Sequence, residues 1–344
     1  MTRAHVALAD GLVVVENVDS PAEANPESRL NGERAECVAV SPSAPERVFA
    51  GTFEAGLWRS TDGGNAFEPI GDAIGPEAVT AVAVSPHDPD TVIAGTEPSR
   101  LYRSDDGGET WRRLDGLADL PSAEEWSFPP RPHTHHVRWI GPSSTDPETW
   151  YVGVEAGALV VTRDGGRSWQ DRPPGSRRDV HTIATHPDAP DRVYCAAGDG
   201  YAESDDGGRT WGHLQQGLEH RYCWGLAVDP GDPDRVIVST AHGARDAHRT
   251  GPSYLYRKRS GKRSASDAGG GRDGPAWERL DDVAVSTGEG ATRAVLAAGT
   301  EPGELYAACE DGLYRTGDGG DSWTACRIGN DDLGNDPIRG LAVG

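Results

Sequence analysis

Short apolar segments recur along the chain, and each ends at a turn rich in proline, glycine, aspartate or serine. In two consecutive repeats, one apolar segment runs into Ser-Pro and a second ends in Gly-Thr: Cys37–Pro42 with Val48–Thr52, and Ala81–Pro86 with Val92–Thr96. Segments of this length, bounded by turn residues, are typical of β-strands and too short for helices. The pattern predicts an all-β protein in which a unit of four short strands repeats.

A second motif lies within most units and reads Ser/Thr-x-Asp-Gly-Gly-x-x-Trp, with Phe67 replacing tryptophan in the first copy. Aspartate accepts hydrogen bonds from the backbone of its own turn, and the paired glycines adopt positive φ without steric cost. The tryptophan can bury about 150–250 Å² of surface. The motif predicts a tight hairpin, and we interpret its five aspartates as structural rather than catalytic: Asp62, Asp106, Asp164, Asp206 and Asp318.

These motifs resemble the Asp boxes, or BNR repeats, of sialidases, glycosyl-hydrolase-like propellers and sortilin-type receptors. The resemblance implies a β-propeller in which the box joins the third and fourth strands of a blade, on the face away from the ligand. The match to sialidases is incomplete, because their Phe/Tyr-Arg-Ile-Pro motif is absent from the sequence. The repeat is therefore specific for the fold and says little about the activity.

We expect one domain, residues 1–344, with seven four-stranded antiparallel blades closed by pairing of the N- and C-terminal strands. Ile338–Val343 predicts a first strand, and His5–Val15 predicts the second and third strands of the same blade, so that no sheet edge stays open. The expected blades are 34–70, 78–114, 134–172, 179–214, 221–280, 291–327, and 337–344 together with 1–33. Residues 259–275, rich in Gly and Ser, predict a disordered loop.

The first strand of each propeller blade lines the central channel, and functional loops gather where these strands start. The repeats differ from one another mostly at one position, six residues before the turn proline or its equivalent, whereas the neighbouring apolar residues are alike. This variation predicts a ligand pocket at the channel mouth. The seven positions are Glu36, Thr80, His136, His181, Trp224, Arg293 and Arg339.

Further polar side chains lie beside this ring in the sequence. Those at the starts of the first strands are His133, His135, Asp179, Arg221 and Tyr222. Those that follow the second strands are the carboxylates Glu97, Glu155, Asp199 and Glu310. Two long insertions on the same face, residues 115–132 and 242–252, flank the histidine-rich blades, and we expect them to form a rim or lid over the pocket.

Composition narrows the choice of partners. The net charge is −22, and among 33 basic residues only Lys258 and Lys262 are lysines, which resembles the composition of proteins from halophiles. Such acidity argues against nucleic acid, because phosphate binding needs a basic face. No apolar run approaches the roughly 18 residues of a membrane span, and the N-terminus lacks a signal-peptide pattern, so we expect a cytoplasmic protein without membrane contact.

The favoured function is a glycosyl-hydrolase-like propeller that binds, and potentially hydrolyses, a sugar or other polar small ligand in the central pocket. Glycoside hydrolysis uses two carboxylates about 5–10 Å apart, and arginine pairs bidentately with anionic substrates. The candidate catalytic residues are His136, His181, Glu155 and Asp199. The candidate ligand-binding residues are Glu36, Glu97, His133, His135, Asp179, Arg221, Tyr222, Trp224, Arg293, Glu310 and Arg339.

Two alternatives stay open at the level of the sequence. Histidines and carboxylates at the channel mouth could hold a divalent metal ion as cofactor of a lyase or hydrolase, with His135, His136, His181 and Asp179 as ligands. The chain could instead be a non-catalytic scaffold that recognises a protein partner, as many propellers do.

Overall fold

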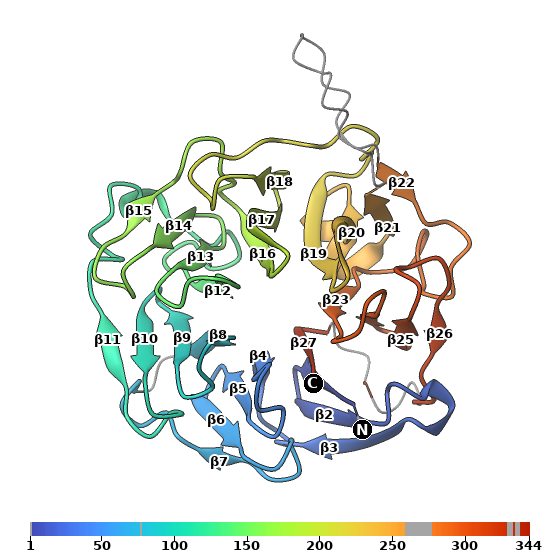
Figure 1. Cartoon of the computed structure of the whole chain (residues 1–344), viewed down its shortest axis with the longest axis horizontal. Coiled ribbons are helices and arrows are strands. Elements are labelled where there is room, and N and C mark those ends of the chain that lie inside the picture. Colours follow the sequence, from blue (N-terminus) through green and yellow to red (C-terminus); the bar gives the residue numbers. More distant parts are fainter. Residues whose placement is uncertain (1, 76–77, 259–276, 329–332, 334–337) are drawn as a thin grey trace.

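A computed structural model describes residues 2–75, 78–258, 277–328, 333 and 338–344 of the chain. Seven antiparallel sheets stand radially around a central channel (Figure 1). The predicted seven-bladed β-propeller is thus confirmed. The expected disordered loop, 259–275, lies outside the described residues.

The strands of each sheet run in chain order from the channel outward, apart from the sheet that joins both ends of the chain. The innermost strands are β4 (Ala35–Val40), β8 (Ala78–Val84), β12 (Val137–Pro142), β16 (Val180–His186), β19 (Tyr222–Asp229), β23 (Val295–Ala298) and β27 (Gly340–Val343). The second strands are β1 (Arg3–Leu8), β5 (Val48–Thr52), β9 (Val92–Glu97), β13 (Trp150–Val154), β17 (Ala189–Ala197), β20 (Asp232–Ala241) and β24 (Leu305–Cys309).

The third strands are largely buried, whereas the fourth strands are mostly exposed. The third strands are β2 (Gly11–Glu16), β6 (Leu57–Ser60), β10 (Leu101–Ser104), β14 (Ala158–Thr162), β18 (Gly200–Ser204), β21 (Ser253–Lys258) and β25 (Gly312–Thr316). The fourth strands are β3 (Asn25–Arg29), β7 (Glu68–Pro69), β11 (Arg112–Leu114), β15 (Gln170–Asp171), β22 (Trp277–Arg279) and β26 (Thr324–Ala325). In the blade of β16–β18, an antiparallel bridge between Glu203 and Gly212 stands in place of the fourth strand.

The two ends of the chain close the ring by sharing one sheet, ordered β27-β1-β2-β3. Val6 pairs with Leu341, and the backbones of Arg3 and Gly344 exchange hydrogen bonds of 2.8 and 3.0 Å. The side chains of this sheet join those of the β23–β26 blade in one buried cluster that includes Val6, Val15 and Tyr306. Because the sheet holds both ends, the ring has no open edge at this junction.

The apolar core lies between neighbouring blades rather than within one. In one such cluster, Tyr194 and Tyr201 of the β16–β18 blade pack against Val236 and Tyr256 of the next blade. Alternate residues of a strand face opposite sides of its sheet, so each blade offers one apolar face to each neighbour. Burial of this area, at about 25 cal/mol per Å², holds the ring together.

The Asp boxes lie at the end of the blades opposite the first-strand starts. The first glycine of each box has positive φ, as in Gly107 at 69° and Gly207 at 68°. Its N–H donates to the turn between the first and second strands of the same blade, for instance from Gly107 to the Asp90 carbonyl at 2.9 Å. The boxes therefore brace the turns of their own blades on the face away from the strand starts.

Short helical turns lie between the strands, among them η1 (Pro21–Glu23), η2 (Ala123–Glu125) and η3 (Asp246–Thr250), of which the last is π-helical. The latter two belong to the insertions 115–132 and 242–252. In the described part of the chain, no helix has the length and apolar character needed to cross a membrane.

Candidate functional site

A cavity of about 760 Å³ opens where the first strands start, and all seven blades contribute to its wall. Six of the seven predicted ring residues line it: Glu36, Thr80, His136, Trp224, Arg293 and Arg339. His181, the seventh, is fully buried in the blade behind Asp179, which does line the cavity. The volume falls within the range of ordinary small-ligand sites.

A β-bulge at the start of the first strand explains how these side chains reach the channel. Pairing with the second strand skips one residue in five blades. The skipped residues are Glu36, Thr80, Arg138, His181 and Trp224. A bulge leaves its extra residue outside the strand ladder and changes the direction of its side chain. The most variable position of the repeat is therefore a position that is not paired with the second strand.

The bulges correct the sequence alignment in the third blade. There the equivalent residue is Arg138, and not His136. The backbone N–H groups of Ser41, Ser85 and Ser143 close the same turn in their blades, which shows that Pro142 stands two residues before the position of the other turn prolines. His136 nevertheless lines the cavity, and it is the residue immediately before β12.

Both insertions form part of the cavity wall. Phe128–Arg131 comes from the first insertion, and residues 244, 245, 248 and 249 come from the second. Arg131 pairs with both oxygens of Glu97, and its guanidinium lies over Phe53 and Phe128, at 5.2 and 4.8 Å from the ring centroids. Glu97 is thereby used to anchor the first insertion and does not itself line the cavity.

The cavity is cationic, in contrast to the rest of the molecule. Its three acidic residues are Glu36, Glu155 and Asp179. Its seven arginines are Arg34, Arg131, Arg138, Arg245, Arg249, Arg293 and Arg339. On a chain of net charge −22, this local excess of guanidinium groups points to an anionic ligand.

Arg293 is the most buried of these arginines. Its Nη1 donates to the Ile338 carbonyl at 2.8 Å, its Nε donates to Nδ1 of His248 at 3.0 Å, and its guanidinium lies 4.0 Å from the Trp224 ring. No carboxylate within the described residues forms an ion pair with it. Burial, together with Arg138 and Arg339, lowers the pKa of Arg293 to about 9. A buried cation without a counter-ion is costly, and an anionic ligand would offset that cost.

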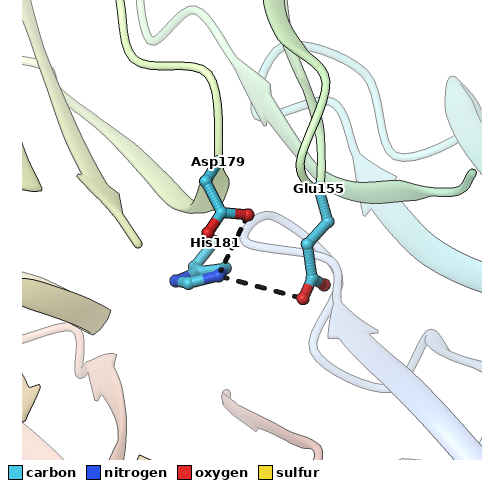
Figure 2. Close-up of side chains that lie close together, drawn as sticks. All are labelled: Glu155, Asp179 and His181. Atoms are coloured by element: carbon cyan, nitrogen blue, oxygen red, sulfur yellow. Dashed lines mark ion pairs between the residues drawn. The ribbon is translucent and has the colours of Figure 1, made fainter. Parts of the chain in front are cut away.

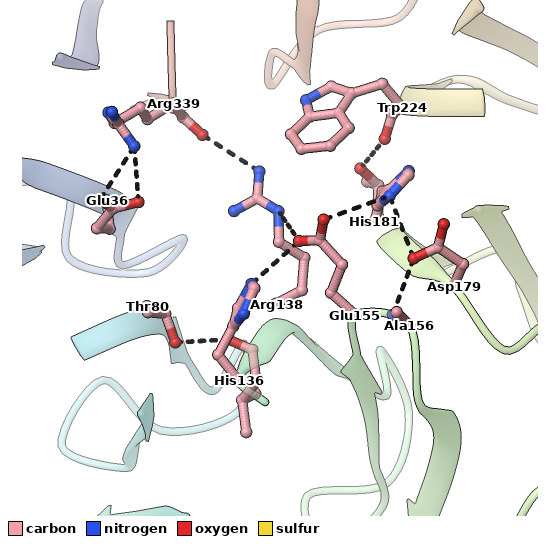
Figure 3. A network of polar contacts seen from close by, with 12 residues as sticks. Glu36, Thr80, His136, Arg138, Glu155, Ala156, Asp179, His181, Trp224 and Arg339 are labelled. Atoms are coloured by element: carbon pink, nitrogen blue, oxygen red, sulfur yellow. Dashed lines mark hydrogen bonds and ion pairs between the residues drawn. The ribbon is translucent and has the colours of Figure 1, made fainter. Parts of the chain in front are cut away.

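Glu155, which also lines the cavity, is the centre of a polar network (Figure 3). Its Oε2 accepts a hydrogen bond of 3.0 Å from Nε2 of His136 and lies 3.7 Å from Nε of Arg138. Burial alone would raise the pKa of Glu155, but the hydrogen bond from His136 and the charge of Arg138 hold it well below its ordinary value. The carboxylate is therefore ionised at neutral pH.

Glu155, Asp179 and His181 converge at the cavity wall (Figure 2). One ligand atom from each lies within 4.8 Å of the other two. Nε2 of His181 is 3.7 Å from Oδ1 of Asp179 and 3.9 Å from Oε1 of Glu155. Burial raises the pKa of Asp179, aided by the charge of Glu155, and burial lowers the pKa of His181. Of the predicted metal ligands, His181 and Asp179 belong to this group, whereas His135 and His136 do not.

Several predicted site residues lie outside the cavity wall: Glu97, His133, His135, Asp199, Arg221 and Glu310. His133 and Arg221 are exposed, and His135 packs edge-on against Trp126. Glu310 accepts a hydrogen bond from Thr292, and Asp199 is close to the backbone N–H groups that precede His181. Conversely, the sequence did not single out Arg138, Arg34 or Phe53; aligning Ser143 with Ser41 would have found the first.

Comparisons with known proteins agree with this architecture. Residues 55–170 match the family model of sortilin, neurotensin receptor 3 (Sortilin-Vps10). No curated protein matches the chain. This match agrees with the resemblance to BNR-type Asp-box repeats that the sequence motifs indicated.

Solved structures share the fold at low identity. A GH74 enzyme of Niastella koreensis aligns with a TM-score of 0.68 and 17% identity over 93% of this chain and 51% of that one. YCF48 bound to D1 peptide aligns with a TM-score of 0.60 and 14% identity over 97% and 88%. A GH74 xyloglucanase of Xanthomonas campestris aligns with a TM-score of 0.50 and 15% identity over 96% of this chain and 68% of that one. The chain spans only 38% and 51% of the first two GH74 enzymes that it matches.

Proposed function

We propose that the cavity binds a small, anionic and hydroxylated ligand of the sugar-acid class. The observation that carries this proposal is the set of arginines around the channel mouth, in which Arg293 is buried without a carboxylate partner among the described residues. Arg138 and Arg339 belong to the same ring of strand starts. A ligand carboxylate would supply the bidentate partner that a guanidinium favours.

The aromatic side chains of the cavity suit the apolar faces of a sugar ring. Trp224 lines the cavity, with the guanidinium groups of Arg138 and Arg293 near its ring, at 4.7 and 4.0 Å from the centroid. Phe53 and, from the first insertion, Phe128 line the same cavity. Apolar surface with a few fixed polar groups is the usual composition of a small-ligand site.

The structural neighbours include carbohydrate-active enzymes, such as the GH74 xyloglucanase, and a peptide-bound protein, YCF48. Both kinds of ligand are compatible with a channel-mouth site. The arginine excess favours an anion in either case, and a peptide would present its carboxylates to the same groups. We favour the sugar acid because the cavity, with both insertions in its wall, has a volume of about 760 Å³, which is of small-molecule size.

Isothermal titration with glucuronate, galacturonate and N-acetylneuraminate, in a buffer with EDTA, tests the proposal. At least one acid should bind, and its neutral parent sugar should bind at least 10-fold more weakly. Arg339→Gln should weaken binding of the acid about 10-fold or more, because one charge-assisted pair contributes about 1.5–3 kcal/mol.

Arg221→Gln is the matched control, since Arg221 is also an arginine at a strand start but is exposed and outside the cavity wall. Its affinity should equal that of the unmodified chain. The proposal is wrong if no sugar acid binds, or if both substitutions weaken binding equally. Binding of an acidic peptide in place of every sugar acid would instead favour the scaffold function.

Hydrolysis of a glycosidic bond is a second candidate, favoured by one specific observation. Oxygens of Glu155 and Asp179 lie within 4.8 Å of each other at the cavity wall, which approaches the ~5 Å spacing of the two carboxyl groups in retaining glycosidases. Asp199, the other predicted carboxylate, lies outside the cavity wall. Release of reducing sugar from oligosaccharides of the binding acid, abolished in Glu155→Gln, would establish the activity.

A further inference from the structure

We propose that Glu155, Asp179 and His181 bind one divalent transition-metal ion at the wall of the cavity. An imidazole nitrogen and two carboxylate oxygens converge there within 4.8 Å of one another (Figure 2). The inference goes beyond ligand binding, although it concerns the same cavity.

His181 is prepared as a ligand by its surroundings. Its Nδ1 lies 2.8 Å from the carbonyl oxygen of Cys223, which can only accept, so Nδ1 carries the proton and Nε2 presents a lone pair. The ring is 1% exposed and is held between Tyr222 and Trp224, with centroids 5.1 and 4.4 Å away. A metal-bound histidine commonly has this second hydrogen bond to a carbonyl.

The lone pair of His181 Nε2 has no hydrogen-bond partner among the described residues, although the atom is buried. It points toward Asp179 Oδ1 and Glu155 Oε1, at 3.7 and 3.9 Å. These distances are too long for hydrogen bonds. Three electron-rich atoms facing one another repel, and a bound cation would turn this repulsion into coordination.

The two carboxylates are also held for this role. Oδ1 of Asp179 accepts a hydrogen bond of 2.8 Å from the Ala156 N–H, and Oε2 of Glu155 accepts one from His136, which leaves Oε1 facing His181. Gly198 provides the space for Asp179, since a Cβ on this glycine would lie 1.9 Å from Oδ2. The position of the Asp179 carboxylate therefore depends on a residue that is not itself a ligand.

The ligand set indicates which ions fit. Imidazole suits zinc and iron, carboxylate suits manganese, and metal–ligand bonds of about 2.0–2.2 Å need only a small approach of the three atoms. Glu155 and Asp179 line the cavity, so the remaining coordination positions would face the ligand. A divalent ion would also neutralise the two carboxylates, which otherwise repel the anion that the arginines attract.

The test is calorimetric titration of the chelator-treated full chain with MnCl2 or ZnCl2 alone, in about 0.5 M KCl to screen weak binding by surface carboxylates. One ion per chain is expected. Asp179→Asn and Gly198→Ala should each lower the affinity at least 10-fold. The Mn2+ complex should show nitrogen coupling in pulsed EPR, lost in His181→Gln.

Asp199→Asn is the control, because Asp199 is a nearby carboxylate outside the three-residue group. It should bind metal like the unmodified chain, and circular dichroism should show all variants folded. The proposal is overturned if the unmodified chain shows no saturable site, or if Asp179→Asn and Asp199→Asn bind equally. The titration contains no sugar, and the sugar-acid titration contains EDTA, so failure of one leaves the other intact.

Discussion

At the scale of the residue, the Asp-box aspartate acts as a backbone cap. Oδ1 of Asp206 accepts hydrogen bonds from the N–H groups of Arg209 and Thr210, at 2.9 and 2.8 Å, and from the hydroxyl of Ser204 at 2.8 Å. Burial by itself would raise the pKa of Asp206, but these hydrogen bonds, together with one from the Thr210 hydroxyl, outweigh it and lower the pKa to about 2. Its ionised form thus stabilises the fold, and this contribution is lost as the pH falls from about 4 to 2.

We expect Asp206→Ala to lower the free energy of unfolding at neutral pH by about 1–2 kcal/mol, the usual cost of a lost capping group. Sugar-acid affinity should stay unchanged, because the box lies at the opposite end of the blade. Urea denaturation and calorimetry of the same variant measure the two quantities. A loss of affinity without loss of stability would show that the box contacts the ligand.

At the scale of the element, β1 places a buried histidine at the junction where the ring closes. Nε2 of His5 donates to the carbonyl of Gly63, in the Asp box of the next blade, at 3.2 Å. Arg3, two residues before it, donates to the carbonyls of Asp62 and Gly63. Burial lowers the pKa of His5 to about 4, so the folded chain holds it neutral. The closing strand therefore depends on an uncharged imidazole.

The stability of the fold should decrease as the pH falls from about 6.5 to 4. In this range the unfolded chain protonates His5 and the folded chain does not, which amounts to about 3 kcal/mol over the whole window. Other histidines whose pKa is lowered contribute in the same direction, among them the half-buried His248. His5→Gln should reduce the pH dependence of the unfolding free energy by the part that His5 contributes, which denaturation at a series of pH values measures. An unchanged pH dependence would contradict a neutral, buried His5.

The repeat made the strands predictable, because turn residues and apolar segments recur at a fixed spacing. The weak strand β3 was less accessible to prediction, since all its residues are polar or proline and their side chains are partly or fully exposed. The bulged residue is the predicted ring residue in four blades, Glu36, Thr80, His181 and Trp224, but lies two residues later in the third blade, where Pro142 occurs early. Contacts across blades, such as His181 with Glu155, follow from neither spacing nor composition.

At the scale of the whole molecule, the charge of the cavity is opposite in sign to the net charge of the chain. The net charge of −22 repels an approaching anion at long range, whereas the arginines attract it only at close range. Salt screens the long-range field, with a Debye length of about 10 Å at 0.1 M, more than it screens contacts inside a cavity. The expectation of a halophilic origin, drawn from composition, stays a prediction.

We therefore expect the association rate constant of a sugar acid to rise several-fold between about 0.05 and 1 M KCl, opposite to ordinary steering between unlike charges. Stopped-flow fluorescence can follow it, because Trp224 lines the cavity. The rate for a neutral analogue should change little. A rate for the acid that falls steeply with salt would show that the local arginine field dominates at long range.

The bulges separate the residues that form the sheets from the residues that can contact a ligand. Because the extra residue of each bulge lies outside the strand ladder, its identity is free to change while the neighbouring backbone pairing persists. The scaffold thus has one exchangeable residue in each of these five blades. A library randomised only at the bulge residues that line the cavity, Glu36, Thr80, Arg138 and Trp224, would vary specificity over a constant fold, which makes this chain a starting point for engineered receptors.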